Sequence, residues 1–343
     1  MAKKDLRIGD IGEFGFIASI KDDCHYSPEK LIRGIGDDCA VIGPYNGNVF
    51  LITTDMLVED IHFISGKIHP EELGQKVMAV NLSDIAAMGG TPLHVFISLA
   101  VPISMEVSII HSIYDGMKAM CRDYGVNILG GDTCSSPEKI SINVCMIGEA
   151  PENEVLYRKG AKPGDIIYVT GTLGDSAAGL KIIREKVNAP VKTASILIGA
   201  HNRPVPFLKA GRIIARSKLA GAMIDISDGL ISDLRHVCKA SNVGARLLFS
   251  GIPLSTEVIS MARSNDLDPY ELALYGGEDY RLLVIIPERN AEDFEGLFTN
   301  GEPCHIYRVG EITEIGGIGM VMENGNEKIL KIGGYDHFNA NSF

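Results

Sequence analysis

Residues 70–90, PEELGQKVMAVNLSDIAAMGG, predict one helix that places a carboxylate beside an apolar face. Pro70 suits the first helical turn, and the two glutamates after it favour the positive end of the helix dipole. Gly89-Gly90 provides the stop. The apolar stripe at helical spacing comprises Leu73, Val77, Val80 and Ala87. Asp84 lies at the edge of this stripe, so it is the first candidate site residue.

Strand-like and helix-like segments alternate on both sides of this helix. β-rich runs are expected at Cys39–Ile42 and Val49–Thr53, and a second helix at Glu106–Tyr124. Further strands are expected at Val126–Leu129 and Ile140–Ile147. Because strands and helices intermix, the sequence predicts an α/β (α+β) fold.

A change of composition at residues 150–164 divides the chain, because prolines and glycines interrupt the periodicity there. For a chain of 343 residues this predicts two domains, residues 1–150 and 151–343. The second domain is expected to alternate strands and helices as well. The strands are expected at Ile166–Thr170, Met223–Ile226, Leu282–Ile286 and Ile306–Val309, and the helices from Asp175, at Leu230–Ala240 with Gly244 as its stop, and at Ala291–Phe298.

Composition argues against several classes of protein. The formal net charge of −12 does not suit a nucleic-acid or anionic-membrane binder, because both need a basic surface. Seven cysteines without a CxxC pair favour reduced thiols over a disulfide framework or a structural zinc site. No stretch approaches the length of a membrane span, and no apolar signal region follows the first residues. We therefore expect a cytoplasmic protein.

Aspartates at the ends of apolar segments are the most informative pattern. In five places an aspartate adjoins Gly, Ser or Thr, and strand ends are where carboxylates project from a rigid scaffold into a cleft. The five places are Gly34–Asp38, Thr53–Asp55, Asn81–Asp84, Gly130–Thr133 and Asp225–Gly229. Magnesium prefers oxygen ligands and is usually held by a few carboxylates together with water and substrate phosphates. The pattern therefore predicts a site for magnesium and a nucleotide's phosphates.

Any one of these aspartates is more often a turn former or a helix N-cap than a metal ligand. Two pairs, Asp37-Asp38 and Asp225/Asp228, place like charges close together, which costs energy unless a cation compensates. That cost favours the metal interpretation. The common nucleotide motifs are absent, since the sequence has no P-loop, no GxGxxG between a strand and a helix, and no protein-kinase motif set.

Taken in order along nearly the whole chain, these motifs resemble the thiamine-monophosphate kinase family, of the superfamily that includes aminoimidazole ribonucleotide synthetase. The resemblance rests on the aspartate motifs and on further segments toward the C-terminus. The matching segments are Gly34–Ala40, Thr53–Asp55, His62-Phe63, Ala79–Gly89, Gly130–Thr133, Gly160–Asp165, Gly171–Leu180, Asp225–Leu230, Gly276–Tyr280 and Gly334–Phe338.

The resemblance implies an enzyme that uses ATP to phosphorylate thiamine monophosphate to thiamine diphosphate, the last step of thiamine diphosphate biosynthesis. It implies a homodimer, in which strands of the N-terminal domain pair with those of a second subunit, and a C-terminal domain that completes the site. ATP is then the co-substrate and several Mg²⁺ ions assist an in-line transfer. No protein side chain forms a covalent intermediate in such a transfer.

The resemblance also implies roles for individual residues. The Mg²⁺ ligands would be Asp38, Thr53, Thr54, Asp55, Asp84, Asp132, Asp225 and Asp228. The ATP contacts would be Gly131, Asp132, Arg158 and Ser227, and the contacts to thiamine monophosphate His62, Glu278 and Tyr335. Without the resemblance, Arg158 is by default a solvated surface charge, Tyr335 a packing residue and His62 a partly buried histidine.

Two alternatives remain open. One is another ATP-dependent synthetase of the superfamily, of the selenophosphate or hydrogenase-maturation type. The latter type ends in a reactive cysteine, whereas this chain ends Asn339–Phe343, and no glycine-rich signature surrounds Cys24, in the stretch where selenophosphate synthetases have their reactive residue. The other is a regulatory protein that binds ATP and magnesium without turnover. Missing catalytic residues would favour it, and none is evidently missing.

Overall fold

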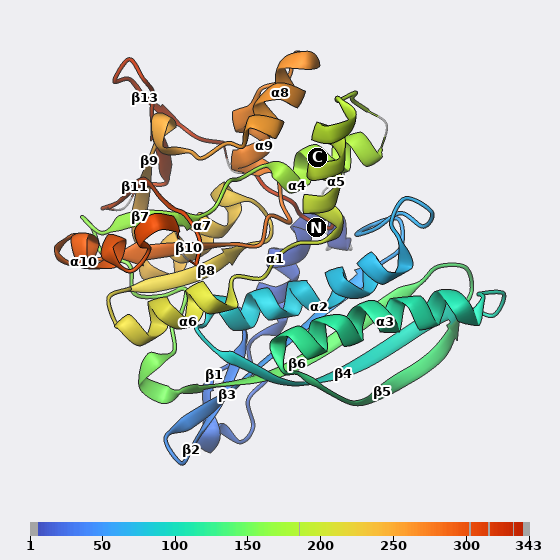
Figure 1. Cartoon of the computed structure of the whole chain (residues 1–343). Coiled ribbons are helices and arrows are strands. Elements are labelled where there is room, and N and C mark those ends of the chain that lie inside the picture. Colours follow the sequence, from blue (N-terminus) through green and yellow to red (C-terminus); the bar gives the residue numbers. More distant parts are fainter. Residues whose placement is uncertain (1–5, 185, 302, 315, 332, 339–343) are drawn as a thin grey trace, which may run out of the picture.

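The computed structural model describes residues 6–184, 186–301, 303–314, 316–331 and 333–338. The terminal residues Asn339–Phe343, which bear on the first alternative, lie outside the described residues. Two β-sheets form the frame of the molecule, with helices between and around them (Figure 1). Among the helices of the described part, none has the length and apolar content that a membrane crossing needs. The mixed α/β (α+β) fold that the sequence predicts is confirmed.

The first sheet has six strands in the order β1-β2-β3-β6-β4-β5. Neighbouring strands are antiparallel except for the β4–β5 pair. The strands are β1 (Leu31–Arg33), β2 (Ala40–Tyr45), β3 (Asn48–Val58), β4 (Thr91–Pro102), β5 (Asn127–Ser136) and β6 (Ser141–Pro151). The sequence analysis did not predict β4. Its Pro92 lies at an irregularity in the pairing with β6, a place where a strand tolerates proline.

Helices α2 (Pro70–Ala87) and α3 (Val107–Tyr124) cover one face of this sheet and leave the other face open (Figure 1). The sequence predicted both helices to within one residue or so at each end. Glycine lets them approach closely, because a Cβ on Gly74 would lie 1.9 Å from the carbonyl oxygen of Ile113. Strand β3 alternates accordingly, with buried side chains toward the helices and Thr54 exposed on the open face.

The second sheet has seven strands in the order β13-β12-β9-β11-β7-β10-β8. Neighbouring strands of this sheet are antiparallel except for the β12–β9 pair. The strands are β7 (Ile166–Thr170), β8 (Ala222–Ile226), β9 (Gly244–Leu248), β10 (Arg281–Ile286), β11 (Ile306–Thr313), β12 (Ile318–Val321) and β13 (Glu327–Ile329). The sequence predicted the four strands β7, β8, β10 and β11, and missed β9 and the short strands β12 and β13.

The remaining helices surround the second sheet or lie at the junction of the two sheets (Figure 1). They are α1 (Ile8–Ile20), α4 (Asp175–Ile183), α5 (Val191–Asn202), α6 (Leu208–Ser217), α7 (Leu230–Ser241), α8 (Thr256–Ser264), α9 (Pro269–Tyr275) and α10 (Ala291–Gly296). The predicted stop of α7 was wrong, because Asn242, with φ 55°, ends the helix. Gly244 begins β9 instead, where a Cβ would lie 2.6 Å from the carbonyl oxygen of Glu314.

Helix α2 joins the two sheets in one hydrophobic core. It contacts β3, β4 and β6 on one side and β8 and β10 on the other. The shared core includes Leu51 of β3, Val77 of α2, Tyr168 of β7 and Val284 of β10. Burial of this apolar surface holds the two halves together, so the C-terminal turns of α2, with Asp84, are fixed at their junction.

Candidate functional site

A cavity of about 1120 Å³ opens at the junction of the two halves, and side chains of both halves line it. Of the residues that the sequence predicts for the site, all but Gly131 and Asp132 line this cavity. Those that do are Asp38, Thr53, Thr54, Asp55, His62, Asp84, Arg158, Asp225, Ser227, Asp228, Glu278 and Tyr335. Segments up to three hundred residues apart in the sequence therefore contribute to one concave site.

Three carboxylates from different parts of the chain meet at one end of the cavity. Asp38 lies in the turn before β2, Asp84 near the end of α2, and Asp225 near the end of β8. Each offers an oxygen, and these three oxygens lie within 4.8 Å of one another. Asp55, from β3, lines the same cavity and lies close enough to Asp38 and Asp84 for their charges to interact. A cluster of oxygen ligands at this spacing fits a hard divalent cation.

Neighbouring side chains orient these carboxylates. Ser83 Oγ donates to Asp225 Oδ2 over 2.6 Å, and the Thr53 hydroxyl donates to Asp84. Arg158 donates to Asp38 Oδ1 from Nε over 3.0 Å and from Nη2 over 2.6 Å. These contacts fix the cluster before any ligand binds.

The two carboxylate oxygens of Asp38 have different surroundings. Its Oδ2 is buried and has no hydrogen-bond donor within the described part of the chain, whereas Oδ1 accepts both contacts from Arg158. A buried carboxylate oxygen without a partner is costly unless a cation or a proton occupies it. The neighbouring Asp37 differs, because its oxygens accept from Arg33 Nε and from the backbone N–H of Arg158, each over 2.9 Å. Asp37 therefore holds the loop, and Asp38 faces the site.

The charge of this cluster is strongly perturbed. Burial raises the pKa of Asp38 to about 7, although the nearby Arg158 opposes the shift. Burial also raises the pKa of Asp55 and of Asp225 to about 6. For Asp84, burial and then the charges of Asp55 and Asp225 raise the pKa well above its ordinary value. One arginine does not balance four buried carboxylates, and a bound divalent cation would return these pKa values toward their ordinary range.

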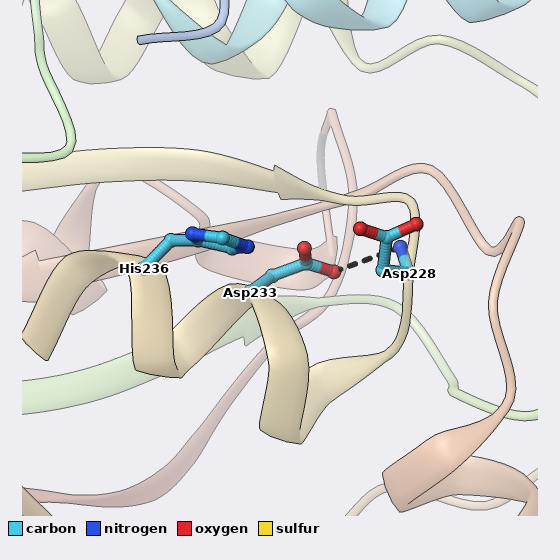
Figure 2. A group of neighbouring side chains, drawn as sticks. All are labelled: Asp228, Asp233 and His236. Atoms are coloured by element: carbon cyan, nitrogen blue, oxygen red, sulfur yellow. Dashed lines mark hydrogen bonds between the residues drawn. The ribbon is translucent and has the colours of Figure 1, made fainter. Parts of the chain in front are cut away.

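Asp228 belongs to a second acidic group, with Asp233 and His236 (Figure 2). Asp233 Oδ2 accepts the backbone N–H of Asp228 and of Gly229, each over 3.1 Å, so it caps the start of α7. The His236 ring packs on the Phe14 ring, with 4.5 Å between the two ring centroids. Asp233 thus explains why Asp228 is held at the cavity wall, and the sequence analysis missed this role. An aspartate in the first turn of a helix was the available signal.

Aromatic rings and one glutamate form the other end of the cavity. The His337 ring lies 4.9 Å from the His62 ring and 4.8 Å from the Tyr335 ring, edge-on to the latter. The backbone N–H of Tyr335 donates to the carbonyl oxygen of Asp228 over 3.0 Å, which holds this C-terminal segment against the site. Burial lowers the pKa of His62 to about 4, so the ring is neutral at neutral pH. Glu278 lines the same cavity and lies near His62, because Lys76 Nζ contacts both Glu278 Oε1 and the carbonyl oxygen of His62.

Sequence reasoning also missed His337, Lys76 and His201. His337 lies within the matching segment Gly334–Phe338, but no role was assigned to it, and its proximity in sequence to Tyr335 was the available signal. Lys76 lies in the predicted helix α2, and only the fold shows that it contacts Glu278.

Gly131 and Asp132 do not line the cavity of this chain. Both are exposed on β5, the edge strand of the first sheet, outside the cavity. Among the described residues, the one donor to Asp132 Oδ1 is the backbone N–H of the next residue, Thr133, over 2.9 Å. Gly131 fits tightly against β4, because a Cβ there would lie 1.7 Å from the carbonyl oxygen of Ile97. Thr54 borders the cavity, but it is exposed on the open face of this sheet, where its hydroxyl donates to Asn143 Oδ1 over 3.0 Å.

Two family models match the chain. Residues 36–150 match the N-terminal domain of AIR synthase related proteins, and residues 162–323 match the C-terminal domain of the same proteins.

Similar proteins match over nearly the full length of the chain. The thiamine-monophosphate kinase of Escherichia coli K12 is 39% identical over 333 residues, covering 95% of this chain and 98% of that protein. The one of Bacillus subtilis 168 is 36% identical over 333 residues, covering 95% and 99%. A solved structure described as AaThiL complexed with AMPPCP and TMP superposes with a TM-score of 0.85 at 34% identity, covering 98% of this chain and all of that one. The chain therefore belongs to the thiamine-monophosphate kinase family, built from the two domains of AIR synthase related proteins.

Proposed function

We propose that this protein is a thiamine-phosphate kinase, which transfers the γ-phosphoryl group of ATP to the phosphate of thiamine monophosphate and releases thiamine diphosphate and ADP. One observation supports this most strongly. A single cavity has a carboxylate cluster at one end and an aromatic, glutamate-bearing wall at the other, in a chain that superposes on AaThiL with an ATP analogue and TMP bound. The two proposed domains, residues 1–150 and 151–343, each contribute to both ends.

The carboxylate end suits Mg²⁺ and the phosphates of ATP. Asp38, Asp55, Asp84 and Asp225 would hold the ions, and the orphaned oxygen of Asp38 fits such a role. Thr53, Thr54, Asp132 and Asp228 complete the proposed ligand set. Bound there, Mg²⁺ neutralises phosphate charge and assists the displacement. No side chain of the chain needs to form a covalent intermediate.

Three other residues are proposed to contact ATP. Arg158 forms an ion pair with Asp38 of the cluster. Its guanidinium can also pair with phosphate oxygens. Ser227 lies in the turn that precedes α7, where backbone N–H groups favour anions. Gly131 is the third, in the partner arrangement described below. These groups position the γ-phosphoryl group and do not transfer protons.

The opposite end is proposed to bind the acceptor. Tyr335 and His62 offer aromatic surface to the rings of thiamine monophosphate, and Glu278 offers a carboxylate to their polar or charged edge. The acceptor's phosphate then lies toward the carboxylate cluster, in line with the γ-phosphoryl group. Catalysis comes from this alignment and from the charge neutralisation at the cluster.

We also propose that the protein acts as a homodimer through the open face of the first sheet. No helix of the described chain covers this face (Figure 1). Met56 of β3 and Phe96 of β4 are large apolar side chains exposed on it, and exposed apolar surface of this kind marks an interface. Gly131 and Asp132 are on the edge strand of the same sheet, so we place them in the site of the partner subunit.

Intersubunit complementation tests the shared site. Asp84→Asn and Asp132→Asn homodimers should each be inactive. A dimer with one copy of each variant regains one intact site if Asp132 acts across the interface, so mixing after mild dissociation should restore part of the activity. Failure to recover activity in a verified mixed dimer, or a monomer by sedimentation at assay concentration, contradicts this arrangement.

We place the reaction in the cytoplasm. All seven cysteines are free thiols, which suits a reducing compartment.

Conversion of the substrate tests the function itself. The purified protein with ATP, Mg²⁺ and thiamine monophosphate should yield thiamine diphosphate and ADP in equal amounts, measured by chromatography. Thiamine monophosphate that stays unchanged while ATP is bound would instead favour a regulatory protein that binds ATP without turnover.

A further inference from the structure

A lysine that lies outside the cavity wall supports the Glu278 end of the cavity. Lys76 of α2 is fully buried, and its side chain has no exposed surface. Its Nζ contacts Glu278 Oε1 over 2.9 Å, the carbonyl oxygen of His62 over 3.1 Å and His201 Nε2 over 3.3 Å. A buried ammonium is costly unless it is paired and hydrogen-bonded, so these contacts need a specific reason to persist.

His201 holds the second oxygen of the same carboxylate. Burial, reinforced by the charge of Lys76, lowers the pKa of His201 to about 4, so the ring is neutral at neutral pH. Its Nε2 faces an ammonium, which can only donate, so the ring hydrogen is on Nδ1. Nδ1 lies 3.3 Å from Glu278 Oε2 and 3.0 Å from Ser176 Oγ. Each oxygen of Glu278 therefore faces a donor.

The backbone also aims Glu278. Its φ of 65° is in the left-handed region, which is unfavourable for a residue with a side chain. Its N–H donates to the carbonyl oxygen of Ser227 over 2.7 Å, which fixes this conformation. A Cβ on the preceding Gly277 would lie 2.5 Å from that same oxygen, so the turn needs glycine there. The side chain keeps 23% of its surface exposed, toward the cavity.

We propose that Lys76 is a positioning residue for the phosphate acceptor: together with His201 it fixes Glu278 as an oriented anion that receives the cationic, amine-bearing rings of thiamine monophosphate. This rests on the proposed function, because the thiazolium cation and the aminopyrimidine are what that acceptor presents. Lys76 does not touch the acceptor. The ammonium acts through Glu278, by keeping its charge and its direction when the cavity is closed off from water.

A purely structural role for Lys76 makes a different prediction. If the ammonium only tied α2 to the turn at residues 276–280, its loss would lower stability and the active fraction, and would leave the affinity of the folded protein for each substrate unchanged. The affinity for thiamine monophosphate, compared with that for ATP, separates the two roles.

The experiment compares Lys76→Met, Glu278→Gln and the double variant with the wild type. Lys118→Met, an exposed lysine of α3 whose one ion pair among the described residues is with Asp115, is the matched control. Steady-state kinetics give KM for each substrate. Calorimetry with AMPPCP and Mg²⁺ present gives Kd for thiamine monophosphate without turnover, and thermal melts report folding.

Lys76→Met should raise KM and Kd for thiamine monophosphate about 10-fold and leave KM for ATP within about twofold, because it strips Glu278 of its charged partner. The double variant should bind thiamine monophosphate no worse than Glu278→Gln alone, because the two residues act as one unit. It also removes the unpaired charge, so it serves if Lys76→Met alone fails to fold.

Unchanged affinity in Lys76→Met, or additive losses in the double variant, would overturn the proposal. A wild type that binds thiamine monophosphate but forms no product would refute the kinase function and leave this comparison of affinities intact. A wild type that does not bind thiamine monophosphate at all would overturn both.

Discussion

At one end of the cavity, Asp38, Asp84 and Asp225 bring their carboxylates together with Arg158 as the neighbouring cation. At the other end, Glu278 is a single carboxylate between a lysine and a histidine. Burial raises the pKa of the first three. The pKa of Glu278 is lowered, because Lys76 and then His201 outweigh the opposing effect of burial.

The difference shows which end depends on a ligand. The aspartate end, which we call the acidic end, has more carboxylates than the single Arg158 can balance, so it suits an added cation. The glutamate end contains its own cation and is an ordered anion before the acceptor arrives. Changes at the acidic end should therefore affect Mg²⁺ and turnover, and changes at the glutamate end should affect the acceptor.

The largest effect is expected from Asp84→Asn at the acidic end. Asn keeps the shape and can still accept from Thr53, but it removes one charge from the cluster. Turnover should fall at least about 100-fold. Changes to residues that only support a metal's ligands can already cost up to about 100-fold, and Asp84 is itself a proposed ligand. Asp115→Asn, an exposed helix position, is the control and should leave turnover unchanged. Equal rates for Asp84→Asn and the wild type would remove Asp84 from the metal site.

At the glutamate end, Tyr335→Leu removes aromatic surface and keeps the apolar contact. KM for thiamine monophosphate should rise about 10-fold, the value of one stacked ring. The Mg²⁺ concentration for half-maximal activity should stay the same, since the Tyr335 ring packs edge-on against His337 and is not part of the carboxylate cluster. A change in the Mg²⁺ requirement alone would show that the two ends are not separate.

A subtler change at the acidic end is Ser83→Ala. Ser83 acts on the cluster through its hydrogen bond to Asp225. The Mg²⁺ concentration for half-maximal activity should therefore rise up to about 10-fold, with KM for thiamine monophosphate unchanged. Ser264→Ala is the control, because within the described part of the chain the Ser264 hydroxyl donates to its own helix at the surface. No difference between the two serine variants would mean that Asp225 needs no such support.

The smallest effect concerns pH. At Asp38 and Asp225 the folded protein binds a proton more tightly than the unfolded chain does, because the ordinary pKa of an aspartate is near 3.8. Their contribution to metal-free stability is thus complete below that value and is lost as pH rises through about 6 to 7.

Mg²⁺ competes with those protons, so it should raise Tm more at pH 8 than at pH 5.5. At tenfold excess over Kd the rise at pH 8 should be about 3 °C. Differential scanning fluorimetry measures this, with Asp84→Asn as the control. A Mg²⁺ shift that is equal at both pH values would contradict the raised pKa values.

Sequence reasoning predicted the acidic end better than the glutamate end. The aspartates come after apolar segments beside small residues, and such a pattern can be recognised locally. Lys76 looks like an ordinary residue of a helix, and its contact with Glu278 joins positions about two hundred residues apart. Only the packing of α2 between the two sheets brings them together, so no local pattern could predict it.

The same reasoning explains the errors in the fold. Strand β4 was missed because proline marks its second and last positions, although its pairing with β5 and β6 dominates. Gly244 was expected to end α7, yet Asn242 also tolerates the left-handed conformation and occurs first. The position of Gly131 and Asp132 outside the cavity was not predicted, because a sequence motif does not say on which face or edge of a sheet its residues lie.

The most direct test of the contrast between the two ends is Mn²⁺ binding, measured by electron paramagnetic resonance at pH 8 with AMPPCP present. The account predicts that the wild type and Glu278→Gln bind Mn²⁺ with the same stoichiometry and affinity, whereas Asp84→Asn loses at least one ion or binds it at least about 10-fold more weakly. Equal Mn²⁺ binding by Asp84→Asn and the wild type, or a loss of binding in Glu278→Gln, would contradict the account.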